Sequence, residues 1–303
     1  MPRKRENALI KSERRFGLAL VTPSFFLVFS IIIFPILFSL YISFHSWNWK
    51  RPQTIGRFIG LTNYINAITN KFFVDSLRTT FIFAFSTVFL TFIMAMAIAL
   101  VLNTDFRGRG VVRSILLIPW AIPAVSNAVL WQWAFDADYG WINGILRSLH
   151  LISEPIQWLS RGDLALGCVI FASVWKGVPF TAIVLLAALQ TVPKALTEAA
   201  RIDGAGRWGV FKNVTLPWIS TSILVVNILN TVWTFQSFAL IYNLTQGGPG
   251  TATQVLPYFI WIEAFRWMDA GLGSATAFVL MAIIFVLTAV YFKLFYRGGG
   301  EYR

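Results

Sequence analysis

Residues 79–102 read "TTFIFAFSTVFLTFIMAMAIALVL" and contain no charged side chain. As an α-helix rising 1.5 Å per residue, this stretch would be about 36 Å long. That length exceeds the roughly 30 Å hydrocarbon layer of a bilayer. The stretch therefore predicts a membrane-spanning helix, and similar apolar runs on either side of it decide the fold class.

The composition of the whole chain excludes a soluble fold. Of its 303 residues, 57% are hydrophobic and 13% are charged, whereas roughly 25% of the residues of an average soluble domain are charged. Cys168 is the only cysteine, so an intrachain disulfide is excluded. His45 and His150 are far apart and neither has another metal-ligating side chain at ligand spacing, so we expect no metal site.

Six apolar runs predict an all-α membrane protein with six transmembrane helices. The third run contains Pro119 and Pro123, and prolines inside a membrane helix bend it. The predicted spans lie at about 16–44, 79–102, 111–135, 164–189, 217–241 and 271–296.

The distribution of basic residues predicts the orientation of these spans. The formal net charge is +12, and 16 of the 25 lysines and arginines fall in residues 1–16, 104–113, 191–213 and 292–303. Each segment adjoins an apolar run, which is typical of cytoplasmic connections under the positive-inside rule. We therefore expect both termini to be cytoplasmic, with a basic segment at 1–15 and a six-span transmembrane domain at 16–303, and we expect no nucleic-acid partner.

The connection between the fourth and fifth spans, residues 191–216, is longer and more polar than a simple turn requires. Pro193 and Gly204 suit the first turn and the end of a helix. An interfacial amphipathic helix without a partner would have the same periodicity. The combination of charges, small residues and glycines favours a docking surface instead. One predicted face holds Ala195, Ala199 and Ile202, and the adjacent face holds Lys194, Glu198 and Arg201.

The same connection resembles the signature loop of the permease subunits of binding-protein-dependent ABC importers. The matching residues are Glu198-Ala199-Ala200, Gly204, Val214 and Leu216-Pro217, with Val214 where isoleucine is usual. The longer form "EAARIDGAG" is similar to the carbohydrate-uptake branch, which includes maltose and glycerol-phosphate permeases. The segments "FIGLTNY", "LLIPWAIPAV", "VWKGVPF", "ALQTVP" and "LTQGGPGTAT" resemble other recurring segments of sugar permeases, in the same order.

This resemblance implies a type I importer permease fold in a bacterial or archaeal cytoplasmic (inner) membrane. It also implies three protein partners: a dimer of ATPase subunits, a second permease subunit and an extracytoplasmic solute-binding protein. The chain contains no G-x-x-x-x-G-K-[ST] motif, so we expect it to bind no cofactor and to be no enzyme, with ATP and Mg²⁺ on the ATPase subunits. The resemblance assigns ATPase docking to Glu198, Ala199, Ala200, Arg201, Asp203 and Gly204.

The fourth and fifth spans hold the candidate cargo site. Asn230, Trp233, Thr234 and Ser237 share one helical face, and the resemblance adds Trp175, Gly177 and Phe180. Aromatic rings beside amides and hydroxyls suit a neutral sugar, and we expect a di- or oligosaccharide. Thr234 and Ser237 stand where maltose-type subunits have longer amides, which leaves the particular sugar open. Two alternatives remain: these residues pack the helices, or the partner permease holds the whole site.

Lys176 is the one charged residue well inside a predicted span. A lysine at the centre of a span costs about 2.5 to 3.5 kcal/mol on insertion scales. Its ammonium group should therefore meet water, a carboxylate or backbone carbonyls, or reach the interface. We favour a structural or gating role over binding an anionic cargo such as glycerol phosphate or another polyol phosphate. An ion-coupled secondary transporter is the rival class, but the spans contain no acidic residue at membrane depth.

Overall fold

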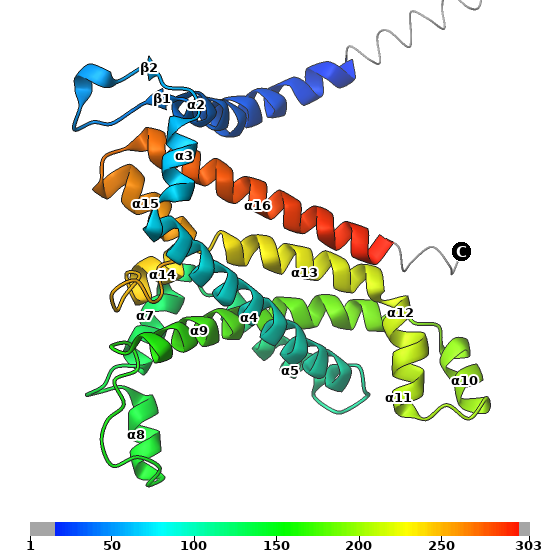
Figure 1. The fold of residues 1–303 in the computed structure, drawn as a ribbon. Coiled ribbons are helices and arrows are strands. Elements are labelled where there is room, and N and C mark those ends of the chain that lie inside the picture. Colours follow the sequence, from blue (N-terminus) through cyan, green and yellow to red (C-terminus); the bar gives the residue numbers. More distant parts are fainter. Residues whose placement is uncertain (1–15, 297–303) are drawn as a thin grey trace, which may run out of the picture. The chain divides into compact units, whose positions relative to one another are not determined.

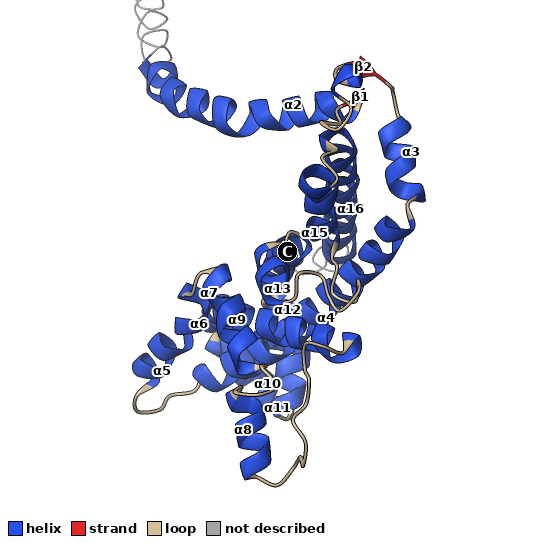
Figure 2. Ribbon diagram, turned by 90° about the vertical axis from the view of Figure 1, so that its left-hand side faces the viewer, coloured by secondary structure: helices blue, strands red, loops and turns tan. Residues whose placement is uncertain are grey.

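The computed structural model describes residues 16–296, and these residues are mostly helical (Figure 2). The predictions for residues 1–15 and for the C-terminal end after residue 296 lie outside the described residues. The chain divides into two compact units, and the first comprises residues up to Ile68 together with Ile262–Phe278. The second comprises Thr69–Trp261 and the residues from Val279 onward.

The first unit contains the first span and a small hairpin. A continuous helical run covers Phe16–Ser43. Its elements, with the others of this unit, are η1 (Phe29–Ile33), α2 (Phe34–Ser43), β1 (His45–Ser46), η2 (Pro52–Thr54), β2 (Arg57–Phe58), α3 (Thr62–Thr69), η4 (Ile262–Arg266) and the beginning of α16 (Ala270–Tyr296).

Hydrogen bonds from buried and partly buried amides hold this unit together. The buried Asn63 side chain donates to the carbonyl oxygens of Ser43 at 2.9 Å and of His45 at 3.0 Å. The Asn48 side chain donates to Asp269 Oδ2 at 2.8 Å. The end of the first span is thereby attached to α3 and to the segment that precedes α16.

Glu263 is fully buried in the first unit. Burial raises the pKa of this carboxyl from 4.5 to about 7; the neighbouring Thr276 hydroxyl lowers it and the Asp269 charge raises it further. A carboxyl whose pKa is higher in the folded state stabilises that state fully below pH 4.5. This contribution is lost as the pH rises to about 7.

We therefore expect the melting temperature of the purified protein to fall between pH 5 and pH 8. The full loss corresponds to up to about 3 kcal/mol of unfolding free energy. Glu263→Gln carries no charge at either pH and should flatten this profile, whereas Glu154→Gln, at an exposed site, should not. A wild-type profile that is flat between pH 5 and pH 8 would contradict the assignment.

The second unit contains the central helices, and their arrangement is visible in Figure 1. The helices α8 and α10 lie at opposite ends of the long helix α9. The elements are α4 (Lys71–Leu102), α5 (Arg109–Leu116), α6 (Ile118–Ala121), α7 (Ala124–Ala134), α8 (Trp141–Ser148), α9 (Gly162–Gln190), α10 (Lys194–Ile202), α11 (Arg207–Val210), η3 (Phe211–Thr215), α12 (Leu216–Trp218), α13 (Ser220–Phe235), α14 (Ala239–Leu244), α15 (Leu256–Trp261) and the remainder of α16.

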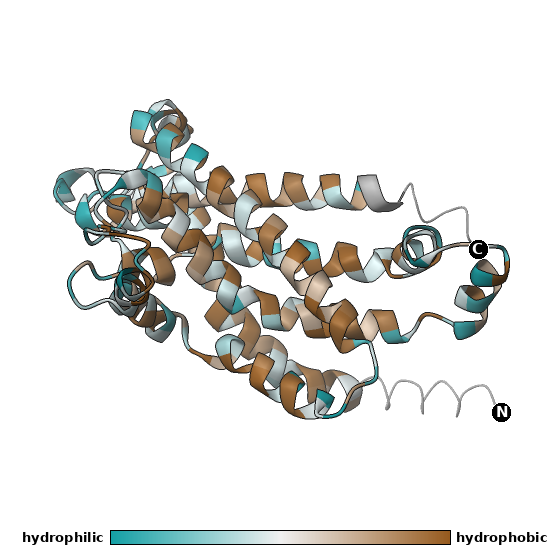
Figure 3. Cartoon of the chain, turned by 90° about the horizontal axis from the view of Figure 1, so that it is seen from below, coloured by the Kyte–Doolittle hydropathy of each residue, from teal (hydrophilic) through white to brown (hydrophobic). Residues whose placement is uncertain are grey.

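Small side chains let α4 and α9 pack closely. Ala95 and Ala99 on α4 and Ala182 on α9 are fully buried in one hydrophobic cluster, which α13 completes with Val226. In membranes, small residues favour close helix packing because the backbones can approach each other. Apolar residues follow the long helices, and hydrophilic residues gather in the connections (Figure 3).

The predicted all-α membrane fold is confirmed, with two spans broken. The described residues hold four helices long and apolar enough to cross a membrane, or six if each of two bent pairs counts as one span. One break of 94° separates Arg109–Ala121 from Ala124–Ala134, where Pro123 cannot donate a backbone hydrogen bond. The other break, of 68°, separates Arg207–Trp218 from Ser220–Phe235.

The predicted fifth span differs from the structure at both ends. Sequence analysis places it at 217–241, but α13 begins at Ser220 and ends at Phe235, and α14 begins separately at Ala239. Gln236 and Ser237 close the last turn, where Ser237 donates its backbone N–H to the Thr234 carbonyl at 3.1 Å. Apolar residues continue on both sides of Gln236 and Ser237. The apolar pattern alone therefore does not show that the helix ends there.

Candidate functional site

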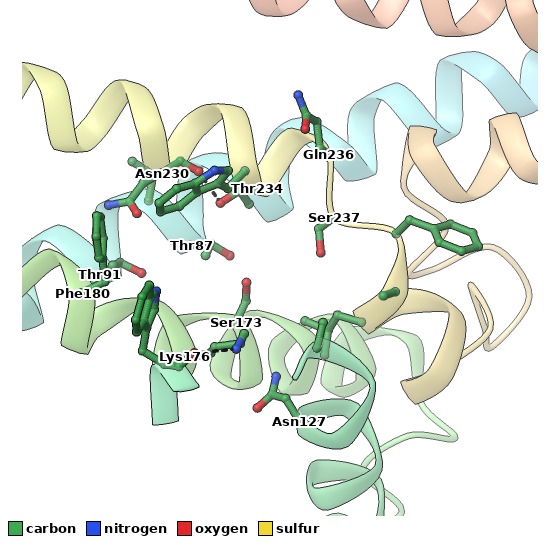
Figure 4. A pocket seen from close by; sticks show the side chains of 18 residues that line it. Thr87, Thr91, Asn127, Ser173, Lys176, Phe180, Asn230, Thr234, Gln236 and Ser237 are labelled. Atoms are coloured by element: carbon green, nitrogen blue, oxygen red, sulfur yellow. Dashed lines mark hydrogen bonds between the residues drawn. The ribbon is translucent and has the colours of Figure 1, made fainter. Parts of the chain in front are cut away.

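A cavity of 410 Å³ lies within the second unit, between α4, α7, α9 and α13. Figure 4 shows side chains from these helices converging on it. Its volume is in the range of small-molecule sites, which is about 300 to 1,000 Å³. The polar and aromatic residues of its lining are Thr87, Thr91, Trp120, Asn127, Ser173, Lys176, Phe180, Asn230, Trp233, Thr234, Gln236, Ser237 and Phe238.

Three aromatic side chains form a row in this lining. The rings of Trp120 and Phe180 are stacked, with centroids 5.6 Å apart and planes 19° apart. The ring of Trp233 meets Phe180 edge to face at 5.3 Å. Trp120 and Trp233 remain 48% and 49% exposed, so both retain accessible ring surface for a ligand.

The polar side chains of α13 are partly engaged within the protein. Asn230 Nδ2 donates to Thr181 Oγ1 at 3.0 Å, and Thr234 Oγ1 donates to the Asn230 carbonyl at 2.7 Å. Asn230 therefore links α13 to α9, and Thr234 has its donor committed to its own helix. The side-chain oxygens Asn230 Oδ1 and Thr234 Oγ1 can each still accept a hydrogen bond from a ligand.

Other polar atoms of the lining lack a partner. Thr87 Oγ1 and Asn127 Oδ1 are buried and form no hydrogen bond within residues 16–296. In Figure 4 the hydroxyls of Thr87, Ser173 and Ser237 point into the same space. Buried polar groups are nearly always hydrogen-bonded, either to protein or to water or a ligand. The cavity therefore suits a ligand that carries several hydroxyl groups.

Gly177 allows α4 to approach α9 at the edge of the cavity. A Cβ atom at this position would lie 3.4 Å from Thr91 Cγ2 and 3.5 Å from its Oγ1. A larger side chain would therefore press on Thr91, which itself lines the cavity.

The structure brings together most of the residues that sequence analysis assigns to cargo. Gly177, Phe180, Asn230, Trp233, Thr234 and Ser237 all line the cavity. The structure does not place Trp175 beside them: Trp175 is absent from the lining and packs edge to face on Trp131 at 5.4 Å, and its role in binding cargo stays a prediction. Adjacent residues of a helix point about 100° apart, so Trp175 faces α7 while Lys176 faces the cavity.

Among the polar and aromatic lining residues, sequence analysis misses seven, namely Thr87, Thr91, Trp120, Asn127, Ser173, Gln236 and Phe238. Thr87 and Thr91 are one helical turn apart in a mostly apolar span, and this spacing indicates that they share one face of the helix. Trp120 and Asn127 lie on opposite sides of the 94° break, and this break brings both to the cavity. The spacing of apolar residues along the sequence does not predict such a break.

Lys176 bridges α9 to the broken third span. Its Nζ donates to the carbonyl oxygen of Trp120 at 3.1 Å and to that of Ile122. These carbonyls lie at the end of α6, just before the break at Pro123. Sequence analysis expects the Lys176 ammonium group to meet water, a carboxylate or backbone carbonyls, or to reach the interface. In the structure it donates to backbone carbonyls.

Lys176→Met should therefore destabilise the protein, because it leaves the Trp120 and Ile122 carbonyls without their donor. We expect a loss of about 1 to 3 kcal/mol, measured as a fall of several degrees in melting temperature. Lys71→Met, which removes the same side chain from the exposed start of α4, should have little effect. An unchanged melting temperature in Lys176→Met would contradict the bridging role.

The predicted docking helix is observed as α10, Lys194–Ile202, with Pro193 preceding it as N-cap rather than lying in its first turn. Gly204 follows the helix with φ at +86°, which favours glycine. Glu198, Ala199, Arg201, Asp203 and Gly204 are exposed, and Ala200 is half-buried.

Large apolar side chains are also exposed around this loop. Ile202 is 86% exposed and Trp208 is 72% exposed. Exposed apolar surface rimmed by charges is typical of protein interaction sites. No group of three His, Cys, Asp or Glu residues that could hold a metal ion occurs in the described part of the chain.

Comparison with known proteins identifies the family. The model of the family described as "binding-protein-dependent transport system inner membrane component" matches residues 88–297. The chain belongs to this family. The permease is 36% identical over 282 residues to the trehalose/maltose transport system permease protein MalF of Thermococcus litoralis, covering 93% of this chain and 94% of the relative.

A second relative agrees with this assignment, and a solved structure has a similar fold. The permease is 34% identical to the sulfoquinovosyl glycerol transport system permease protein SmoG of Agrobacterium fabrum, covering 93% and 91% of the two chains. Its fold is similar to a chain of a bacterial alginate ABC transporter crystallised with a periplasmic protein that holds an alginate pentasaccharide. The TM-score is 0.80 at 21% identity, over 95% and 96% of the chains. The permease is therefore a multi-pass membrane component of a transport system and not an enzyme.

Proposed function

We propose that the permease is a transmembrane subunit of an ATP-driven sugar importer, with the cavity between α4, α7, α9 and α13 as its sugar site. The observation that carries this proposal is the cavity's combination of an aromatic row with buried hydroxyl and amide groups that lack partners. Aromatic faces can stack on the apolar face of a sugar ring. Hydroxyl and amide groups can exchange hydrogen bonds with the sugar hydroxyls.

The charges of the lining favour a neutral sugar. Among the described lining residues, Lys176 is the only charged one, and backbone carbonyls accept two of its N–H groups. Of the relatives named above, the permease of Thermococcus litoralis belongs to a transport system for trehalose and maltose, which are neutral disaccharides. We propose a di- or oligosaccharide as cargo.

We further propose that the permease forms half of the translocation pathway and pairs with a second permease subunit. Two ATPase subunits would bind ATP and Mg²⁺ and dock on α10 and its flanking residues. A solute-binding protein would deliver the sugar from outside the inner membrane of a bacterium or archaeon. The exposed Ile202 and Trp208 support a protein partner at this loop.

Uptake into proteoliposomes that contain the assembled importer and its binding protein tests the choice of cargo. Labelled trehalose, maltose and glycerol 3-phosphate are compared at equal concentrations, with ATP on the side of α10. We expect saturable uptake of a disaccharide that unlabelled glycerol 3-phosphate does not inhibit. Preferential uptake of glycerol 3-phosphate would contradict a neutral-sugar site and would favour an anion held by Lys176.

A further inference from the structure

Trp120, at one end of the aromatic row, lies in the last helical turn before the break of the third span. Its element α6 ends at Ala121, and the 94° break follows directly. Trp120 is 48% exposed. The last turn of a helix leaves carbonyls without partners and opens easily. The direction of the Trp120 ring therefore depends on contacts with other elements.

Two side chains of α9 provide such contacts. Lys176 Nζ donates to the carbonyl oxygen of Trp120 at 3.1 Å. The Phe180 ring stacks on the Trp120 ring, with centroids 5.6 Å apart and planes 19° apart. Lys176 and Phe180 are four positions apart and therefore share one face of α9, and both line the first cavity. This face of α9 thus holds Trp120 by its main chain and by its ring.

The Lys176 ammonium group extends this contact into the break itself, because it also donates to the carbonyl of Ile122. Ile122 has extended backbone angles, with φ at −68° and ψ at 130°, and precedes Pro123, which has no N–H. Lysine side chains commonly donate to the last carbonyls of a helix. Since the two bonded carbonyls lie on either side of Ala121, they restrain the main chain from which the Trp120 ring projects.

A direct contact between Lys176 and the cargo is the competing role. An ammonium group has three N–H donors, and backbone carbonyls accept two of those of Lys176. Turning the ammonium group toward a sugar would leave these carbonyls unpaired, which is unfavourable away from water. A neutral sugar offers no negative charge to offset this loss. The geometry therefore favours a role in which Lys176 keeps its bonds to the main chain.

We infer that Lys176 is a positioning residue of the sugar site, which holds the Trp120 ring where a sugar can stack on it. The inference rests on the proposed function. A binding group retains its geometry only if the residues around it hold it in place. Loss of the lysine should therefore weaken sugar binding through Trp120, in addition to its effect on stability.

A double-mutant cycle on the assembled importer tests this inference. The dissociation constants of labelled trehalose and maltose are measured without the binding protein, well below the melting temperature of each variant. We expect Lys176→Met to weaken binding about ten-fold and Trp120→Ala about 30-fold. The double variant should also lose about 30-fold, because the ring that Lys176 positions is already absent. Independent effects would multiply to about 300-fold.

Three further variants make the cycle specific. Lys71→Met, at the exposed start of α4, should leave the dissociation constant unchanged. Lys176→Arg keeps N–H donors at the end of a long side chain and should recover the affinity to within about three-fold of the wild type. Trp233→Ala removes the other end of the aromatic row. Its effect should multiply with that of Lys176→Met, because the lysine acts on Trp120.

A milder variant provides the same test if Lys176→Met does not fold. Lys176→Gln retains an amide N–H donor on a shorter side chain, so it should support the main chain of Trp120 less well. We expect it to weaken sugar binding about three-fold. In the Trp120→Ala background the same substitution should have no further effect.

An unchanged dissociation constant in a Lys176→Met importer with a lowered melting temperature would overturn the inference, because the lysine would then only stabilise the fold. A loss of about 300-fold in the double variant with Trp120→Ala would also overturn it and would favour a direct contact with the sugar. In both cases the wild type binds sugar, and the proposed function stands. A wild-type importer that binds neither disaccharide would overturn the proposed sugar site and this inference with it.

Discussion

Replacing Glu198 with lysine is expected to abolish ATP-driven sugar uptake while the protein still inserts into the membrane. Glu198 is exposed on α10, and the resemblance to importer permeases implies that it pairs with a basic residue of the proposed ATPase subunit. Reversing one charge of an interfacial pair costs about 2 to 5 kcal/mol, which corresponds to a loss of at least about 30-fold in docking affinity. Uptake into proteoliposomes and ATP hydrolysis by the same preparation measure the effect.

Because no described side chain packs around Glu198 to bury it, the substitution should not unfold the permease. Glu154→Lys makes the same change at another exposed site, in the segment predicted to face outward, and should preserve uptake. Wild-type uptake by Glu198→Lys would refute the docking role of α10.

Trp233→Ala should weaken binding of the sugar to the purified importer by about 30-fold. The substitution removes the end of the aromatic row and the edge-to-face contact with Phe180 at 5.3 Å. Loss of apolar contact with one face of a large ring corresponds to about 2 kcal/mol. The dissociation constant is measured without the binding protein, so that only the sugar site of the importer contributes.

A matched control separates the sugar site from a general loss of packing. Trp49 is 50% exposed, against 49% for Trp233, and lies outside the cavity lining. Trp49→Ala should therefore leave the dissociation constant unchanged. An unchanged constant in Trp233→Ala would place the sugar site in the partner permease.

Hydropathy alone predicts the number of spans well because each long helix must satisfy its backbone internally and match the bilayer thickness. It does not predict the 94° and 68° breaks. Pro119 and Pro123 signal a bend in the third span, but they do not show that Lys176 of another helix donates to the Trp120 and Ile122 carbonyls beside it. The 68° break lies at Ile219, two residues after Pro217, whereas the end of α13 at Phe235 has no proline near it.

The candidate site, like the fold, is predictable from the sequence only in part. Helical spacing groups Asn230, Trp233, Thr234 and Ser237 correctly on one face of the cavity. It cannot show that Asn127 and Trp120 come to the same cavity, because their positions follow from the broken span. It also cannot separate Trp175 from Lys176, since that depends on how α9 is rotated against α7.

The proposed activity of the permease is import of a sugar with energy from ATP hydrolysed on other subunits. The most direct measurement is accumulation of labelled disaccharide in proteoliposomes of the assembled importer with its loaded binding protein, with and without ATP and with ionophores that collapse ion gradients. We expect accumulation that requires ATP and persists in the ionophores. Accumulation that persists without ATP and disappears with the ion gradients would contradict the account.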